Sequence, residues 1–329
     1  MAVLLVASDS AGAGKTSVSL ALATLARRSG RTANVYKPFS VAEGDPDSEV
    51  IAQLSNPELE GWPRSSGSDG PSTGDLSALA TDMSSGDNGA SLNIVELPTE
   101  FGAADVASVA EALDAQILLV TQGRRGLNAS DLTDWKDASG DRLAGVLVNG
   151  VTRYMSTEST GSIAPSFDEA EIDLVGMLPE DRALLSITVE QIRSGLDGRY
   201  VVEEGDVNRP VEHFQVGCMS LDSGELRFGL YANNAVVVRG DRPDIQMSAL
   251  NASVACLLLT RGIDPIEYIS YEAREEETPV VVVESDTLTT MSLLNDVVTS
   301  ARMDTAAKVS KFAELLEAHA DLQRVWSAL

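Results

Sequence analysis

The residues best suited to chemistry lie near the N-terminus, between Ser8 and Thr16. This segment, Ser8-Asp9-Ser10-Ala11-Gly12-Ala13-Gly14-Lys15-Thr16, follows an apolar run at residues 2–7 and precedes apolar residues at helical spacing from Ser17 to Arg28. Glycines between a strand and a helix let backbone N–H groups curl around a phosphate, and the helix N-terminus adds positive potential. A lysine here neutralises β- and γ-phosphate charge, and a threonine hydroxyl ligates Mg²⁺. The pattern predicts a P-loop for ATP or a related nucleotide, formed by Gly12, Ala13, Gly14, Lys15, Thr16 and Ser17.

Apolar runs typical of buried strands alternate with helical patterns and must position this loop. In the first part of the chain they are residues 2–7, a strand ending at 35–38, and residues 92–96, 116–121, 145–149 and 175–179, with helices such as 103–113 between them. Such alternation predicts an α/β fold with a doubly wound parallel sheet. The Ser-, Gly-, Asp- and Pro-rich stretch 59–90 predicts a long loop around one helix.

A second α/β pattern follows a polar stretch at residues 205–210, which we expect to be a linker. Its strands are expected at residues 235–238, 255–259 and 280–283. The sequence therefore predicts two domains, residues 1–200 for the nucleotide and a smaller one at residues 211–329. A closing helix at 188–194 is assigned to the first domain. The tail from Ala306 to Leu329 is expected to form one amphipathic helix on the second domain or against a second subunit.

Several landmarks of the first part resemble the dethiobiotin synthetase family. The family also accepts a polar residue at the start of its phosphate loop, here Asp9, and follows it with a Tyr-Lys-Pro strand end, here Tyr36-Lys37-Pro38. An apolar strand ending in Glu96, another ending in Asn149, and the segment from Gly176 to Asp181 complete the resemblance over residues 1 to about 195. It implies Thr16, Glu96 and Asp47 as neighbours of Mg²⁺, and Asn149 and Pro179 as neighbours of the nucleotide base.

Two of these assignments have simpler alternatives. Asp47 is equally explained as an exposed loop carboxylate, and Asn149 as a cap at the end of a strand. The sequence also departs from the synthetases after Glu96, where their glycine-rich substrate loop is replaced by Leu97-Pro98-Thr99-Glu100. Proline removes a backbone donor, and a glutamate opposes the charge of an acyl-phosphate. Nucleotide binding is therefore better supported than ligase chemistry, and no catalytic residue is assigned.

The second part resembles the DRTGG domain, a small α/β module found in regulatory settings. The matching segments are residues 240–246, 260–262 and 286–290, each just after an apolar strand, where open α/β sheets place ligand sites. Arg261 replaces the first glycine of the module's Thr-Gly-Gly. A purely structural role, in which Asp and Thr cap the following helices, is the alternative. The resemblance implies a candidate second ligand site at Asp241, Arg242, Asp244, Thr260, Asp286 and Thr287.

The order of the two domains is similar to the N-terminal region of long bacterial phosphotransacetylases, without their acetyl-transferring domain. This resemblance implies a regulatory or sensor protein that binds a nucleotide with Mg²⁺ and is linked to acetyl-CoA or acetate metabolism. Its expected partners are a metabolic enzyme and a second copy of the chain, since DRTGG modules are often paired. The alternatives are an ATP-dependent carboxylate-activating ligase, and a dimeric scaffold that binds no nucleotide because Asp9 opposes phosphate charge. A weak ATPase activity stays open.

Composition excludes several other functions. The net charge is −26 and only five of 24 basic residues are lysine, so the surface repels nucleic acid and anionic membranes and resembles the surfaces of proteins from salt-loving microbes. Two cysteines and two histidines argue against a disulfide framework or a histidine-rich metal site. No apolar run approaches the ~20 residues that span a bilayer. We expect a cytoplasmic protein.

Overall fold

The chain forms two compact α/β units in the computed structural model, which describes residues 2–40, 46–54, 64–65, 71–85, 92–218 and 224–329. The first unit comprises residues 1–181 together with 303–329, and the second comprises residues 182–302. The predicted fold class is confirmed. Within the described residues, no helix combines the length and the apolar character needed to cross a membrane.

The first unit contains a six-stranded, wholly parallel sheet with the order β2-β5-β1-β6-β7-β8. Each strand coincides with a predicted apolar run, because a strand in a sheet covered by helices on both sides buries consecutive residues on both faces. The strands are β1 (Ala2–Ser8), β2 (Ala33–Tyr36), β5 (Leu92–Glu96), β6 (Gln116–Gln122), β7 (Leu143–Val151) and β8 (Leu174–Pro179); a separate short pair is β3 (Phe39–Ser40) with β4 (Arg64–Ser65).

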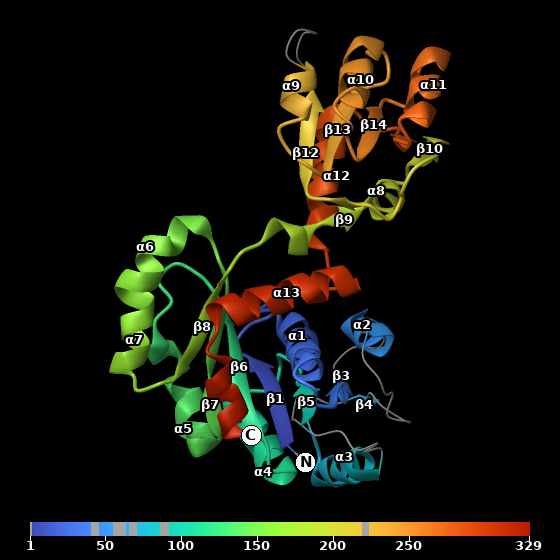
Figure 1. The fold of residues 1–329 in the computed structure, drawn as a ribbon. Coiled ribbons are helices and arrows are strands. Elements are labelled where there is room, and N and C mark those ends of the chain that lie inside the picture. Colours follow the sequence, from blue (N-terminus) through green and yellow to red (C-terminus); the bar gives the residue numbers. More distant parts are fainter. Residues whose placement is uncertain (1, 41–45, 55–63, 66–70, 86–91, 219–223) are drawn as a thin grey trace. The chain divides into compact units, whose positions relative to one another are not determined.

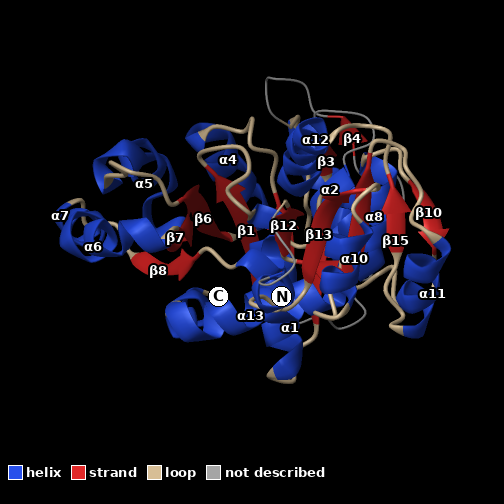
Figure 2. Cartoon of the chain, turned by 90° about the horizontal axis from the view of Figure 1, so that it is seen from above, coloured by secondary structure: helices blue, strands red, loops and turns tan. Residues whose placement is uncertain are grey.

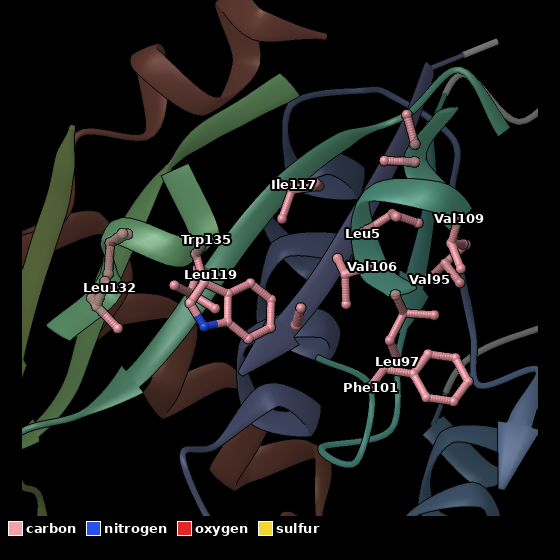
Figure 3. Close-up of a cluster of buried hydrophobic side chains, with 14 of the residues drawn as sticks. Leu5, Val95, Leu97, Phe101, Val106, Val109, Ile117, Leu119, Leu132 and Trp135 are labelled. Carbon is pink, nitrogen blue, oxygen red and sulfur yellow. The ribbon is translucent and has the colours of Figure 1, made fainter. Parts of the chain in front are cut away.

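Helices cover both faces of this sheet. On one face α3, α4 and α5 bury a hydrophobic cluster that includes Leu5, Ile117, Val106 and Trp135 (Figure 3). The helices between β1 and β8 are α1 (Lys15–Arg28), α2 (Pro46–Leu54), α3 (Thr73–Ser85), α4 (Ala103–Leu113), α5 (Thr133–Ser139), α6 (Ser156–Glu158) and α7 (Ala164–Glu169). Helix α3 is the helix expected within residues 59–90; residues 59–63, 66–70 and 86–90 of that stretch lie outside the described residues.

The C-terminal segment belongs to the first unit, so the prediction that placed it on the second domain is wrong. It forms two helices, α13 (Ala306–His319) and α14 (Leu322–Ala328), and α13 packs along α1 (Figure 1). Phe312 and Leu316 are buried. Between the helices, Ala320 is extended and bridges Gly176 of β8, where a Cβ would collide with the C-terminal backbone. This pairing with the sheet edge breaks the single helix that periodicity had predicted.

The second unit has a five-stranded sheet with the order β10-β15-β14-β13-β12, parallel except for β10 (Figure 2). Its strands are β10 (Arg199–Val202), β12 (His213–Gly217), β13 (Asn234–Arg239), β14 (Cys256–Thr260) and β15 (Val280–Val282), with the short pair β9 (Ile187–Thr188) and β11 (Pro210–Val211) beside them. Its helices are α8 (Val189–Gly195), α9 (Gly224–Phe228), α10 (Pro243–Leu250), α11 (Glu267–Glu275) and α12 (Thr287–Thr299).

The boundary between the units lies at Asp181 and Arg182, earlier than the predicted boundary at residues 200–211. Helix α8, expected to close the first domain, packs against α12, and Ile192 shares a buried cluster with Leu294. The segment 205–210, expected to be the linker, therefore lies inside the second unit. Helix α8 belongs to the second unit because its apolar face is buried against α12. The polar stretch at residues 205–210 gave no indication of this packing.

Candidate functional site

The loop between β1 and α1 has the backbone that the glycines were expected to supply. Gly12 and Gly14 adopt φ values of +72° and +93°, in the left-handed region that favours glycine. Gly14 precedes the first turn of α1, which contains Lys15, Thr16 and Ser17. A Cβ at Gly14 would also collide with the Asn149 side-chain amide. A glycine at this position is therefore required by both the backbone conformation and a close neighbour.

Asn149, predicted to lie near the nucleotide base, joins the loop to β7. Its Nδ2 donates a hydrogen bond to the Ala13 carbonyl at 2.8 Å. Pro179 is paired with Val151 across β7 and β8, and the N–H of Glu180 donates to the Val151 carbonyl at 3.0 Å. The sheet thus places Asn149 and Pro179 on neighbouring strands at the carboxyl edge that carries the loop. The hydrogen bond from Asn149 is also compatible with the alternative, a purely structural role at the end of the strand.

Lys15 lies folded into the site. Its side chain is 9% exposed, and its Nζ donates to Ser8 Oγ at 2.8 Å and to Thr99 Oγ1. Burial lowers the pKa of Lys15, an effect that the nearby Glu96 carboxylate opposes. A desolvated ammonium beside a left-handed glycine loop gains much from an arriving phosphate, since an oppositely charged partner is worth most where water is excluded.

Glu96, at the end of β5, is the buried carboxylate of the site. Its Oε1 accepts a hydrogen bond from Thr16 Oγ1 at 2.9 Å and lies 3.0 Å from Lys37 Nζ, which is also 3.6 Å from Asp47 Oδ2. Its Oε2 is buried and has no hydrogen-bond partner among the described residues. Burial raises the pKa of Glu96, while Lys37 counteracts that rise. Of the three residues predicted for Mg²⁺, Thr16 contacts Glu96 directly, and Lys37 links Glu96 to Asp47.

This donor set fits Mg²⁺, which prefers hydroxyl and carboxylate oxygens and keeps several waters when it binds beside phosphates. The partnerless Glu96 Oε2 is a buried acceptor of the required kind. In the described part of the chain, no group of three or more His, Cys, Asp or Glu side chains could by itself hold a metal ion. Thr16, Glu96 and Asp47 therefore suit a metal that also takes ligands from a nucleotide.

Asp9, which replaces the first glycine of the usual pattern, points its carboxylate toward β6. Asp9 Oδ2 accepts a hydrogen bond from Thr121 Oγ1 at 2.9 Å and lies 3.5 Å from Arg124 Nη1. Arg124 also pairs with Asp131. The negative charge that was expected to oppose phosphate is accordingly offset by a neighbouring guanidinium. In the sequence, Arg124-Arg125 could contact a phosphate or a partner but is more simply explained as a solvated pair in a loop. The unusual charge of Asp9 was a signal that a counter-charge must be near.

Two further residues of this site were not among the site residues assigned from the sequence. Lys37 was considered only as part of the Tyr36-Lys37-Pro38 strand end, yet it links the two predicted carboxylates. Thr99 was noted only as part of a segment unlike the synthetases, yet its hydroxyl contacts Lys15. A buried glutamate at a strand end requires a cationic partner, so the need for Lys37 could have been inferred. Nothing local in the sequence marks Thr99.

The residues predicted for a second ligand site all lie at the carboxyl ends of β13, β14 and β15 or just beyond them. The structure gives most of them local partners. Arg242 forms two hydrogen bonds with Asp244, and Asp241 pairs with Arg239. Asp286 N-caps α12 through the N–H of Thr289 at 2.9 Å, and the Thr260 and Thr287 hydroxyls are 3.2 Å apart; Arg261 has a φ of +73°. The capping role considered from the sequence is thus observed for Asp286.

Comparisons with known proteins agree with the second unit's assignment. The family model for the DRTGG domain matches residues 191–297. Similar solved structures include the CBS and DRTGG domains of the regulatory region of Clostridium perfringens pyrophosphatase, complexed with its activator diadenosine tetraphosphate. The identity is 22% and the TM-score 0.32, over 38% of this chain and 53% of that one. This chain therefore spans about half the length of that pyrophosphatase region.

Two other similar structures align with a larger share of this chain. The MinC:MinD cell division complex of Aquifex aeolicus matches at 17% identity and a TM-score of 0.40, over 56% of this chain and 84% of that one. Chloroplast FtsY of Physcomitrella patens matches at 19% identity and a TM-score of 0.40, over 55% and 59%. Likenesses at this level are too weak to transfer any function, so the functional argument depends on the site itself.

Proposed function

For a chain that carries a DRTGG domain after a P-loop-type α/β unit, we propose a regulatory role as a sensor of ATP or a related nucleotide with Mg²⁺. The observation that carries this proposal is the convergence of Lys15, Thr16 and Glu96 at one end of α1. Lys15 is a buried cation held by hydroxyl groups, and Glu96 is a buried carboxylate with one unpartnered oxygen. A phosphate would compensate the burial of Lys15, and a divalent cation would engage the second oxygen of Glu96, whose first oxygen already pairs with Lys37.

Each residue has a defined task in this proposal. The backbone from Gly12 to Ser17 cradles the phosphates, and Lys15 neutralises their charge. Thr16, Glu96 and Asp47 would hold the Mg²⁺, which supplies charge neutralisation between phosphate oxygens. Asn149 and Pro179 flank the base. Lys37 reduces the repulsion between the two carboxylates, because its Nζ lies within 3.6 Å of both.

The resemblance of the domain order to the N-terminal region of long phosphotransacetylases supports a link to acetyl-CoA or acetate metabolism. We place the regulatory output in the DRTGG domain, whose candidate ligand residues are Asp241, Arg242, Asp244, Thr260, Asp286 and Thr287. Pairing of two chains and a metabolic enzyme as partner complete the proposal. A carboxylate-activating ligase remains the second candidate, because the Tyr36-Lys37-Pro38 strand end of that family is present.

The test is calorimetric titration of ATP with Mg²⁺ into the purified chain in molar salt, with ADP release followed in the same samples. We expect binding without substantial turnover. Lys15→Ala should weaken binding by about 10- to 100-fold, the effect of losing hydrogen bonds from a charged group. Lys136→Ala is the matched control, since Lys136 lies on α5 and bonds the Ala170 carbonyl away from the loop. Absence of binding in the parent chain would refute the sensor, and carboxylate-dependent ADP release would favour the ligase.

A further inference from the structure

The ammonium of Lys15 has a resting position inside the protein. It donates to two hydroxyls, Ser8 Oγ at 2.8 Å and Thr99 Oγ1, and these two oxygens are themselves 3.4 Å apart. Neighbouring Glu96 is hydrogen-bonded by Thr16 and Lys37 instead. Hydroxyl oxygens are weaker partners for an ammonium than phosphate oxygens, because only the latter carry charge. The resting contacts therefore compete with an arriving phosphate without excluding it.

Thr99 is held in place by its own segment. Leu97 and Phe101 are buried, the N–H of Leu97 donates to the Val6 carbonyl at 3.0 Å, and the N–H of Phe101 donates to the Pro98 carbonyl at 3.3 Å. Just before α4, the Gly102 N–H donates a hydrogen bond to the Asp105 carboxylate at 3.0 Å. The segment is thus anchored on both sides of Thr99, whereas Lys15 has a long side chain with several rotatable bonds. Contact between them breaks most easily by movement of Lys15.

We propose that Thr99 is a positioning residue that locks Lys15 in its resting position, so that a nucleotide phosphate must displace Lys15 from Thr99 in order to bind. This inference rests on the proposed nucleotide function and adds a regulatory role for the segment after β5. The apparent affinity for the nucleotide is the intrinsic affinity multiplied by the fraction of molecules in which Lys15 is released from Thr99.

Three variants in the full-length chain test the lock by titration with Mg²⁺-ATP. Thr99→Val removes the hydroxyl while keeping the branched shape, and it should tighten ATP binding by about tenfold, the effect expected for one hydrogen bond to a charged group. Thr99→Ser restores the hydroxyl and should return the affinity to the parent value. Ser108→Ala is the control, because Ser108 donates to the Ala104 carbonyl on the exposed face of α4. Unchanged or weaker ATP binding in Thr99→Val would overturn the lock.

A second measurement separates failure of the lock from failure of the nucleotide function. Acetylation of Lys15 by acetic anhydride is followed by mass spectrometry without any nucleotide, with Lys136 as internal reference. The lock predicts faster acetylation of Lys15 in Thr99→Val and the parent rate in Thr99→Ser. If no variant binds ATP, the proposed function fails, and the acetylation rates alone decide the lock: equal rates in Thr99→Val and the parent would refute it.

Discussion

Both units place polar residues at the carboxyl edge of a parallel sheet, but they satisfy them differently. In the first unit the polar groups are buried ions: Lys15 donates to the hydroxyls of Ser8 and Thr99, and Glu96 keeps one oxygen without a partner among the described residues. In the second unit the ions are only partly buried and are paired with near neighbours, as Arg242 is with Asp244. The carboxyl edges of the two sheets therefore differ in their electrostatic arrangement.

This difference indicates which of the two edges is better suited to bind a charged ligand. Buried charges with incomplete partners are costly, and an external ion that completes them recovers that cost on binding. Exposed pairs between neighbouring residues are already solvated and contribute little to either stability or binding. A ligand at the second edge must compete with contacts such as the Asp286 cap of α12. The comparison predicts strong effects of substitution in the first unit and weak effects in the second.

Breaking the buried ion cluster should have the largest effect. Lys37→Met removes the cation that faces Glu96 at 3.0 Å and leaves that carboxylate buried without it, so we expect the free energy of unfolding of the first unit to fall by about 3 kcal/mol, near the lower end for a broken buried pair because Glu96 keeps its hydrogen bond from Thr16. Tryptophan fluorescence during denaturation measures it, since Trp135 and Trp326 belong to the first unit and residues 182–302 contain no tryptophan.

Asp244→Asn is the corresponding change in the second unit and serves as the control. It removes the charge that faces Arg242 at 2.7 Å in a partly exposed pair, and we expect no measurable change in the denaturation midpoint by circular dichroism. Equal destabilisation by the two substitutions would contradict the contrast between the edges.

An intermediate effect is expected from pH. Burial raises the pKa of Glu96 above its ordinary value of 4.5, so the carboxylate takes up a proton at a higher pH than an exposed glutamate does. Metal ligation requires the deprotonated form. Mg²⁺-dependent ATP affinity should therefore fall as pH decreases through this raised pKa, by about tenfold per pH unit below it. Calorimetry from pH 7.5 downward measures this, and an affinity that holds constant down to pH 4.5 would exclude Glu96 as a ligand.

The same proton linkage predicts the direction of the stability change. Between pH 4.5 and the raised pKa, the folded chain binds the Glu96 proton more strongly than the unfolded chain does. The contribution of Glu96 to stability is therefore present at low pH and is lost as pH rises through that window. Glu96→Gln should lack this slope.

The smallest effect is expected from Thr260→Val. The Thr260 hydroxyl is buried and lies 3.2 Å from the Thr287 hydroxyl at the start of α12. Loss of that hydrogen bond should lower the stability of the second unit by about 1 kcal/mol. ATP affinity should stay at the parent value, because the substitution leaves the P-loop edge intact. A large drop in ATP affinity, measured in the same titration, would show that the two edges do not act separately.

Local patterns predicted most of the first unit's strands. The apolar runs at residues 92–96 and 116–121 correspond to β5 and β6 within one residue, because strands buried on both faces require unbroken apolar sequence. The spacing of Gly12, Gly14 and Lys15 likewise predicted the loop, since the backbone conformation and the phosphate geometry depend on neighbours in the chain. Glu96 was assigned from the resemblance to the dethiobiotin synthetases, and in the structure it ends β5, which pairs with β1.

Contacts between distant segments escaped sequence reasoning. The lock on Lys15 joins residues 84 positions apart, and the hydroxyl of Thr99 resembles any other loop hydroxyl in the sequence. From the sequence, Gly176 was noted only as the start of the segment 176–181 that resembles the dethiobiotin synthetases. The structure shows that the C-terminal backbone approaches it too closely for a Cβ.

The sequence by itself determined the α/β class, the phosphate loop and the location of the polar residues at strand ends, because each follows from periodicity or from conformation within a few residues. Only the tertiary structure decided to which unit each helix belongs. Helices α8 and α13 both have apolar faces that fit any complementary surface, and the choice depends on packing against α12 and α1, respectively. The same holds for the charges at the two edges, since burial, rather than residue type, separates the Lys37–Glu96 pair from the Arg242–Asp244 pair.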